Sequence, residues 1–214
     1  MENNTWWELL LAPYRGGNPV WIGLELLAVL LGMASVWYAK KQHIAVFPTG
    51  IVSTGIYVWL LAQYSLLGDM MINAYYVAMS VYGWWYWRVH GPDTDQRPIS
   101  LMTSSERWWA LVLALGSSFC VVVVYLYYDR WTSWTAYADT LTTALFFVAM
   151  WLMARKKMEH WTFWIVGNVI SIPLYWYKGL IFTSFQYAVF TAIALAGYRV
   201  WKNNIDRTPQ TSLK

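Results

Sequence analysis

Cysteine, paired metal ligands and nucleotide-binding motifs are scarce in this sequence, and each shortage excludes a class of protein. The single cysteine, Cys120, cannot form an intramolecular disulfide, and its apolar neighbours predict a buried, unreactive thiol. The sequence has no paired Cys/His set and no His-Glu-x-x-His motif, so it gives no indication of a metal site. It also lacks a glycine-rich phosphate loop ending in Lys-Ser/Thr. We therefore expect neither an enzyme nor a bound cofactor.

Charge is also scarce: only 12% of the 214 residues are charged and 58% are hydrophobic. A soluble domain carries roughly 25% charged residues, and a soluble core of this size could not hide so much apolar surface. The net charge of +4 does not indicate a nucleic-acid partner, because the basic residues form short runs between apolar stretches. The composition predicts an integral membrane protein whose main surroundings are a lipid bilayer.

Seven apolar stretches are each about long enough to cross a membrane as a helix, and none alternates as a barrel strand would. The predicted spans are 20–39, 44–63, 70–87, 108–128, 137–153, 161–177 and 180–201. The segments between and around them include an N-terminal segment at 1–19, a long loop at 89–107 and a tail at 203–214. The predicted fold class is therefore an all-α integral membrane protein with seven transmembrane helices.

Basic residues are distributed unevenly between the two sides of the predicted membrane. Twelve of the 15 Lys and Arg residues fall on the side that holds the C-terminus, and Arg15, Arg130 and Lys178 fall on the other. Loops rich in Lys and Arg stay in the cytoplasm. The sequence thus predicts a multi-pass protein of the cytoplasmic (inner) membrane, with its N-terminus outside and its C-terminus inside.

The chain matches itself without gaps at a spacing of 114 residues. At this spacing Lys41 meets Arg155, and the two ends of Gly83-x-x-x-Trp87 meet Gly197 and Trp201. We interpret the match as two three-helix repeats, 20–88 and 137–202, joined by a linker helix at 108–128. Because a three-helix repeat and one linker helix together make four spans, both repeats enter the bilayer from the same side. This is the parallel, SWEET-like plan of transporters that bind substrate between the repeats.

The sixth predicted span carries the strongest candidate site. Its polar and aromatic residues recur every three or four positions, which places them on one helical face; they are Trp161, Trp164, Asn168, Ser171 and Tyr175. Two indoles above a carboxamide favour a flat, cationic heteroaromatic ring through stacking and cation–π attraction. The alternative is that both tryptophans belong to the aromatic belt at the membrane surface.

Further polar residues lie within the predicted spans. Thr54 and Tyr57 occupy the repeat-equivalent face of the second span, and Asn73 and Gln186 could face the same cavity or form ordinary interhelical hydrogen bonds. Glu25 and Asp139, which match at the same spacing, form either an acidic mouth or solvated carboxylates at helix starts. No Lys or Arg lies deep in a span, and a phosphate at that depth would need one. These patterns favour an unphosphorylated nucleoside or vitamin.

Several of these motifs resemble the PnuC family of vitamin-precursor transporters. The most specific are Trp161-x-x-Trp164-x-x-x-Asn168, the Ile-Ser-Ile-Pro-Leu-Tyr run at 170–175, and Tyr82-Gly-Trp-Trp-Tyr-Trp87. The resemblance implies a homotrimer that moves nicotinamide riboside by facilitated diffusion, with a cytoplasmic kinase trapping the product. It also implies that the Trp-x-x-Trp motif forms part of the substrate site. Thiamine, carried by related subfamilies, is the second candidate substrate, and a vitamin receptor without transport is the alternative function.

Overall fold

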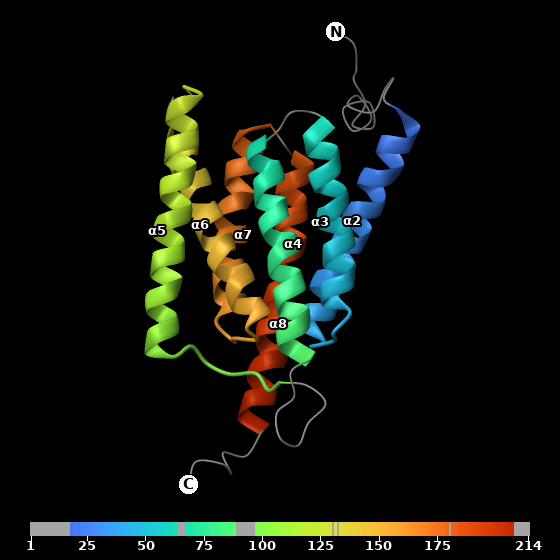
Figure 1. Cartoon of the computed structure of the whole chain (residues 1–214), viewed down its shortest axis with the longest axis vertical. Helices are drawn as coiled ribbons and strands as arrows, with labels where there is room; N and C mark the ends of the chain where they lie inside the picture. Colours follow the sequence, from blue (N-terminus) through green and yellow to red (C-terminus); the bar gives the residue numbers. More distant parts are fainter. Residues whose placement is uncertain are drawn as a thin grey trace.

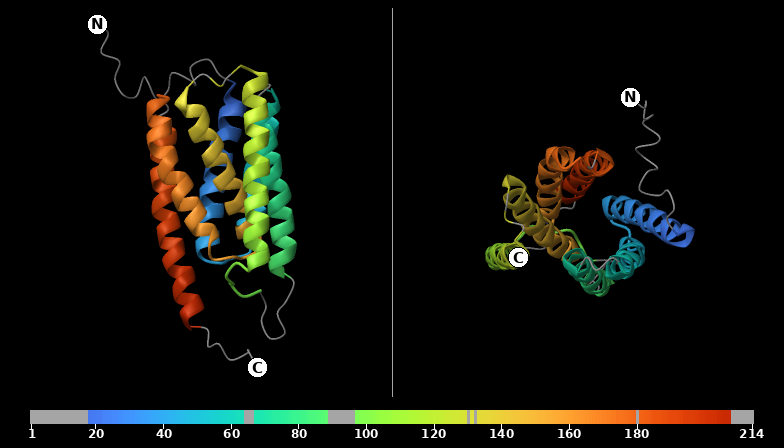
Figure 2. Two further views of the ribbon diagram at one scale, coloured as in Figure 1. Left: turned by 90° about the vertical axis from the view of Figure 1, so that its left-hand side faces the viewer. Right: turned by 90° about the horizontal axis from the view of Figure 1, so that it is seen from above.

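The computed structural model describes residues 18–63, 67–88, 97–129, 131, 133–179 and 181–207, and within them the chain forms seven α-helices (Figure 1). The helices are α2 (Pro19–Lys40), α3 (Val46–Gln63), α4 (Leu67–Arg88), α5 (Ser104–Tyr127), α6 (Trp134–Ala154), α7 (His160–Tyr177) and α8 (Ile181–Arg207). They run alternately up and down, so the start of α2 and the end of α8 lie at opposite ends of the bundle (Figures 1 and 2). An all-α fold with seven long helices is therefore confirmed.

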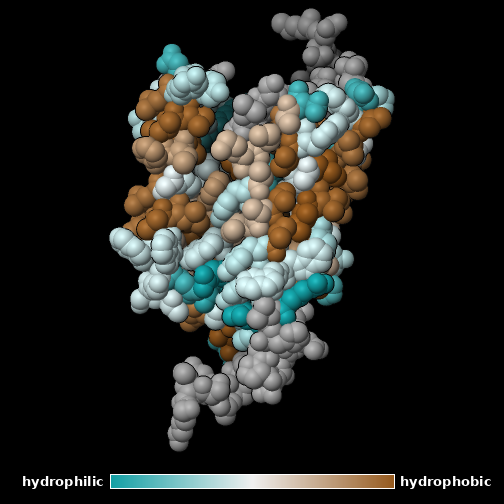
Figure 3. Space-filling view, in the orientation of Figure 1, coloured by the Kyte–Doolittle hydropathy of each residue, from teal (hydrophilic) through white to brown (hydrophobic). Residues whose placement is uncertain are grey.

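The outer surface of the bundle is apolar, as the composition predicts. Large hydrophobic side chains such as Leu26 and Leu30 on α2, and Leu115 and Phe119 on α5, are more than half exposed. In Figure 3 the apolar residues gather over the two sides of the bundle, and polar residues collect near the lower end. A soluble monomer rarely exposes so much contiguous apolar surface. These faces therefore suit lipid rather than water.

Helices α2, α3, α5 and α6 are long and apolar enough by length and composition to cross a membrane. In α4, α7 and α8 the mean hydropathy is lowered by tryptophan, tyrosine and polar residues. Tryptophan and tyrosine favour the membrane interface even though hydropathy scales treat them as nearly neutral.

The predicted helix boundaries differ from the structure by at most three residues, except at the start of α5 and the end of α8, and the environment of Cys120 differs as well. Helix α5 begins at Ser104 rather than 108, because Thr103 and Glu106 form a capping box that satisfies the first backbone N–H groups. Helix α8 continues to Arg207 instead of ending at 201, because helical hydrogen bonds do not need apolar side chains beyond the bilayer. The prediction of a buried Cys120 is wrong, since its side chain is exposed on the outer face of α5.

The helices pack as two groups of three. Helix α3 lies between α2 and α4, α7 lies between α6 and α8, and α5 packs on α6. The two groups meet through two helix pairs, α2 with α8 and α4 with α6 (Figure 2). In each pair the first helix of one group packs against the third helix of the other.

Two hydrogen bonds that join the groups correspond at the spacing of 114 residues. The Trp87 Nε1–H group donates to the Met153 carbonyl at 3.2 Å, and the Trp201 Nε1–H group donates to the Ala39 carbonyl at 3.0 Å. Both the donors and the acceptors are 114 residues apart. Each indole thereby ties the third helix of one group to the end of the first helix of the other.

The loops α2–α3 and α6–α7 correspond in the same way. Gln42 and Lys156, again 114 residues apart, both have a φ of +56°, a left-handed conformation that is uncommon for residues other than glycine. The His43 N–H donates to the Tyr38 carbonyl at 3.0 Å, as the Lys157 N–H does to the Leu152 carbonyl at 2.9 Å. Together with the two buried tryptophans, these loops close one end of the bundle.

Candidate functional site

The predicted face of α7 points into the protein. Trp161, Asn168 and Ser171 are at most 3% exposed, and Trp164 and Tyr175 are half-buried. The opposite face of α7 is exposed at several positions, including Val166, Val169 and Trp176. The five side chains therefore face neighbouring helices, and their role in binding a substrate stays a prediction.

Trp161 belongs to the packed end of the bundle. Its ring meets the Trp201 ring edge-on, with 5.8 Å between centroids, and it lies against α8 at Gly197. A Cβ atom at Gly197 would come within 2.5 Å of the indole, so only glycine allows this approach. The ring of His160 is 4.4 Å away, and the Trp161 Nε1–H group has no hydrogen-bond partner within the described ranges. In this conformation Trp161 is a core residue.

Trp164, one turn further along α7, lies where the two groups meet. Its ring stacks on Phe146 of α6 with centroids 5.3 Å apart, and its edge meets Tyr76 of α4 at 6.5 Å. The stack continues through Tyr187 of α8 to Tyr175, at centroid distances of 6.0 Å and 5.1 Å. Trp164 and Tyr175 thus belong to one aromatic wall built from four helices, α4, α6, α7 and α8.

Sequence reasoning missed most of this wall, including Tyr76, Phe146 and Tyr187. A second stack lies beside it: Tyr75 is parallel to Phe147 with centroids 4.2 Å apart, and its hydroxyl donates to the Phe147 carbonyl at 2.9 Å. The consecutive aromatic pairs Tyr75-Tyr76 and Phe146-Phe147 lie within predicted spans, and they were the feature of the sequence that could have indicated these stacks.

The polar atoms of α7 lie beside the aromatic wall. Ser171 is completely buried, and its hydroxyl has no hydrogen-bond partner among the described residues. The Asn168 carboxamide is also buried, with 3% of the residue exposed. Buried polar groups are normally satisfied, so an unsatisfied one needs an explanation such as water or a ligand. These two residues are the polar part of the candidate site.

The other predicted site residues are placed differently. The Thr54 hydroxyl donates to the Gly50 carbonyl of its own helix at 2.8 Å. Tyr57, Asn73 and Gln186 are half-buried on α3, α4 and α8 respectively. Their part in a substrate site also stays a prediction.

Asp139 contributes to neither arrangement proposed for it. Its carboxylate forms an ion pair with Lys178, at 2.6 Å between Oδ1 and Nζ, and accepts a hydrogen bond from the Tyr125 hydroxyl at 3.0 Å. Its side chain is 14% exposed. The paired carboxylate ties α6 to the end of α7 and to α5, so the expectation of an acidic mouth or a solvated carboxylate is wrong at this position.

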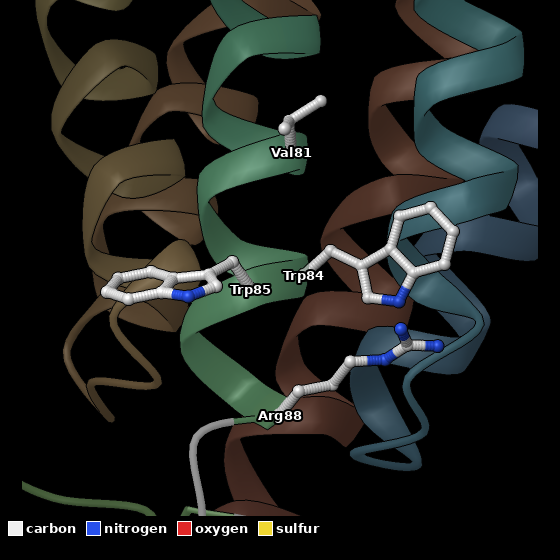
Figure 4. Close-up of a pocket in the computed structure, with 4 residues that line it drawn as sticks. All are labelled: Val81, Trp84, Trp85 and Arg88. Atoms are coloured by element: carbon white, nitrogen blue, oxygen red, sulfur yellow. The ribbon is translucent and has the colours of Figure 1, made fainter.

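Two surface cavities lie away from the α7 face. One, of about 350 Å³, is on the outer side of α4 and is lined by Val81, Trp84, Trp85 and Arg88 (Figure 4). The other, of about 460 Å³, lies between α5, α6 and α7. Neither is lined by any of the five α7 residues. In this conformation the candidate site is a packed interface of aromatic rings and buried polar atoms.

The apolar surface, the seven helices and the inward polar face define a polytopic membrane protein with a candidate site between two three-helix groups. The sequence profile described as "Nicotinamide mononucleotide transporter" matches residues 22–203. The chain therefore belongs to the nicotinamide mononucleotide transporter family. The resemblance to PnuC proteins is confirmed, and so is the expectation that the chain is a transporter and not an enzyme, because the relatives that it matches are named as transporters.

The chain is similar to several curated transporters. The nicotinamide riboside transporter PnuC of Escherichia coli (strain K12) is 25% identical over 214 residues, covering 85% of each chain. PnuC of Neisseria mucosa is 26% identical over 198 residues, covering 86% of this chain and 73% of the relative. The riboflavin/roseoflavin transporter RibM of Streptomyces davaonensis is 24% identical over 180 residues, covering 83% of each.

A solved structure shares the fold. The crystal structure of the vitamin B3 transporter PnuC superposes with a TM-score of 0.62 at 24% identity, covering 86% of this chain and 82% of that one. At this level of identity the likeness supports the helical architecture alone.

Proposed function

We propose that this protein carries unphosphorylated nicotinamide riboside into the cytoplasm by facilitated diffusion. The observation that carries the proposal is the inward face of α7, where the polar atoms of Asn168 and Ser171 lie beside an aromatic wall that includes Trp164. A cationic nicotinamide ring suits such a wall through stacking and cation–π attraction, and ribose hydroxyls suit the buried polar atoms. The names of the PnuC relatives point to the same substrate.

The riboside is favoured over the mononucleotide because the candidate site offers no cation to a phosphate. The Lys and Arg residues in the described part of the chain lie in loops or toward helix ends, and none lies beside Trp164, Asn168 or Ser171. A phosphate within the bilayer would need a charge-assisted partner. Uptake then becomes one-way when a cytoplasmic kinase phosphorylates the product.

Alternating access follows from a SWEET-like parallel repeat in this proposal. The matched tryptophan hydrogen bonds and the matched left-handed residues, all 114 positions apart, support two equivalent three-helix repeats with α5 as the linker. Rocking of one repeat against the other would separate the aromatic wall at the contact between Tyr76 and Trp164. The site would open in this way without unfolding either repeat.

The proposed setting is the cytoplasmic membrane, with the N-terminus outside and the C-terminus inside. Its support is the excess of basic residues at the end of the bundle that holds Arg88, Arg155 and Lys202. The homotrimer and the coupling to a kinase rest on the resemblance to the PnuC family.

Titration of the purified full-length protein with nicotinamide riboside, nicotinamide mononucleotide, thiamine and riboflavin tests the substrate. We expect the riboside to bind most tightly and the mononucleotide at least about a hundredfold more weakly, because its phosphate would be buried without a partner. Riboflavin is included because RibM is among the relatives. Equal affinity for the riboside and the mononucleotide would refute the argument from the missing cation. Tighter binding of thiamine than of the riboside would identify thiamine as the substrate instead.

Counterflow in proteoliposomes separates a carrier from a receptor. We expect unlabelled riboside inside the vesicles to drive uptake of labelled riboside with no ion gradient. Binding without counterflow would contradict the transport mechanism, and a requirement for a proton or sodium gradient would contradict facilitated diffusion.

A further inference from the structure

An apolar groove of about 460 Å³ runs along the outer surface between α5 and the helices α6 and α7. Its walls are apolar side chains of all three helices, namely Ala110, Leu111, Ala114, Val148 and Phe163. Arg107 and Glu159 line the groove at the end where α5 and α7 begin. Ala114 lies two turns further along α5, about 10 Å from the level of Arg107. The groove is therefore charged at the level of lipid headgroups and apolar at the level of acyl chains.

The charged end of the groove holds an unsatisfied carboxylate oxygen. Glu159 Oε1 accepts a hydrogen bond from the Met102 N–H at 2.8 Å, while the buried Oε2 has no partner within the part of the chain that the structure describes. A buried charged oxygen without a donor is costly, so Glu159 Oε2 needs a donor, such as water or a ligand group, that the described residues do not supply.

The neighbouring charges do not satisfy it. Two neighbouring basic side chains already form ion pairs with Glu106, Arg155 at 3.0 Å and Lys157 at 2.9 Å. Arg107 is exposed and forms no ion pair with another described residue. The lining of the groove thus includes one cation without an ion-pair partner among the described residues and one carboxylate with an unsatisfied oxygen, next to apolar walls.

We propose that this groove binds one membrane phospholipid whose headgroup carries both a phosphate and a primary ammonium group. The phosphate would pair with the Arg107 guanidinium, the ammonium group would donate to Glu159 Oε2, and an acyl chain would lie over Ala114, Val148 and Phe163. A headgroup with only negative charge would be repelled by Glu159, and a soluble zwitterion would leave the apolar walls uncovered. The bound lipid fastens α5 to the second three-helix group, and this role is independent of the transported substrate.

Lipid retention by the full-length protein tests the proposal. Detergent-purified, delipidated protein is incubated with phosphatidylethanolamine, phosphatidylcholine or phosphatidylglycerol of identical acyl chains, and the bound lipid is counted by native mass spectrometry. We expect phosphatidylethanolamine to be retained about tenfold more than phosphatidylcholine, whose methylated ammonium group cannot donate a hydrogen bond to Glu159.

Glu159→Gln should abolish this preference, because it removes the charge while keeping an acceptor for the Met102 N–H. Arg107→Gln should weaken retention of both lipids, whereas Arg199→Gln, an exposed position on α8, should change neither.

A second pair of variants tests the apolar channel with the charges intact. Ala114→Phe should block retention by filling the groove, while Leu115→Phe, at a 62% exposed position that does not line it, should not. Equal retention of phosphatidylethanolamine and phosphatidylcholine by the wild-type protein would overturn the proposal, as would a preference that survives Glu159→Gln. A disulfide between two copies of Leu111→Cys, made in a Cys120→Ser background, would also overturn it by showing that a second chain covers the groove.

Discussion

Helices α3 and α7 are the middle helices of their three-helix groups, yet their inward faces differ in chemistry. At the closed end they match: Phe47 meets Trp87 edge-on at 4.9 Å, as Trp161 meets Trp201 at 5.8 Å, and Gly83 and Gly197 make room for the two rings. One turn further they diverge, because Gly50 occupies the position of Trp164 and Thr54 that of Asn168.

The polar atoms of the two helices differ in the same way. On α3 the Ser53 hydroxyl donates to the Ala28 carbonyl at 2.7 Å and the Thr54 hydroxyl to the Gly50 carbonyl at 2.8 Å. On α7 the buried Ser171 hydroxyl has no such partner among the described residues. The comparison indicates that the hydroxyl groups of Ser53 and Thr54 on α3 form hydrogen bonds within the fold. The buried Ser171 hydroxyl on α7 needs a partner that the described residues do not supply.

The largest expected effect concerns the end where the two helices match. Trp161→Ala and Phe47→Ala should both lower stability by about 3–5 kcal/mol, because each removes a nearly fully buried aromatic side chain from a packed core. Thermal denaturation in detergent measures the loss. A Trp161→Ala variant that melts like the wild type but fails to bind riboside would break the equivalence and make Trp161 a binding residue instead.

The next effect concerns the level at which the helices diverge. Trp164→Ala should weaken riboside binding by about 1–3 kcal/mol through loss of stacking and cation–π attraction. Isothermal titration measures the change, with Trp176→Ala, at a 65% exposed position on the same helix, as the matched control. Unchanged affinity in the Trp164 variant would mean that its indole serves only to pack the two groups together.

Two serine variants sharpen the contrast in hydrogen bonding. Ser53→Ala should cost about 1 kcal/mol of stability, because it leaves the buried Ala28 carbonyl without its side-chain donor, and it should leave riboside affinity unchanged. Ser171→Ala should leave stability unchanged or slightly higher, because it removes an unsatisfied buried hydroxyl, and it should lower affinity. If both variants behaved alike in melting and in binding, the proposed division of labour between α3 and α7 would be wrong.

The smallest expected effect is on stability at high pH, and it concerns Lys156 and Gln42, the two matched loop residues with left-handed backbone conformations. Burial lowers the pKa of Lys156 from its ordinary 10.5 to about 8. Between these values the unfolded chain binds more protons than the folded one, so stability should rise as the pH is raised from about 8 towards 10 and should not change through this group below pH 8.

Lys156→Gln, which gives this loop the residue found at position 42, should flatten that rise. Melting temperatures across pH 7–10 measure it, and Lys202→Gln, at an exposed position, provides the control. An equal rise in the wild type and in Lys156→Gln would assign the pH dependence to another group.

The sequence alone determined the class and the broad plan of this protein. Apolar length predicted seven helices within a few residues, because a bilayer span imposes the same requirement on every sequence. The Trp87 and Trp201 hydrogen bonds correspond at the spacing of 114 residues, while the two SWEET-like repeats stay a prediction. The three- and four-residue spacing on α7 predicted the face that turns inward. These features follow from local periodicity, which can be read from a single chain.

Only the tertiary structure decided what each inward residue touches. Trp161 and Trp164 look equivalent in the sequence, but Gly197 lets α8 close on the first, while the second reaches Tyr76 across the two groups. The sequence presents Asp139 as a free carboxylate, but in the structure Lys178, which follows the last residue of α7, forms an ion pair with it. Such contacts join residues up to 162 positions apart, as in the Trp201–Ala39 hydrogen bond, and depend on how helices pack rather than on spacing along one of them.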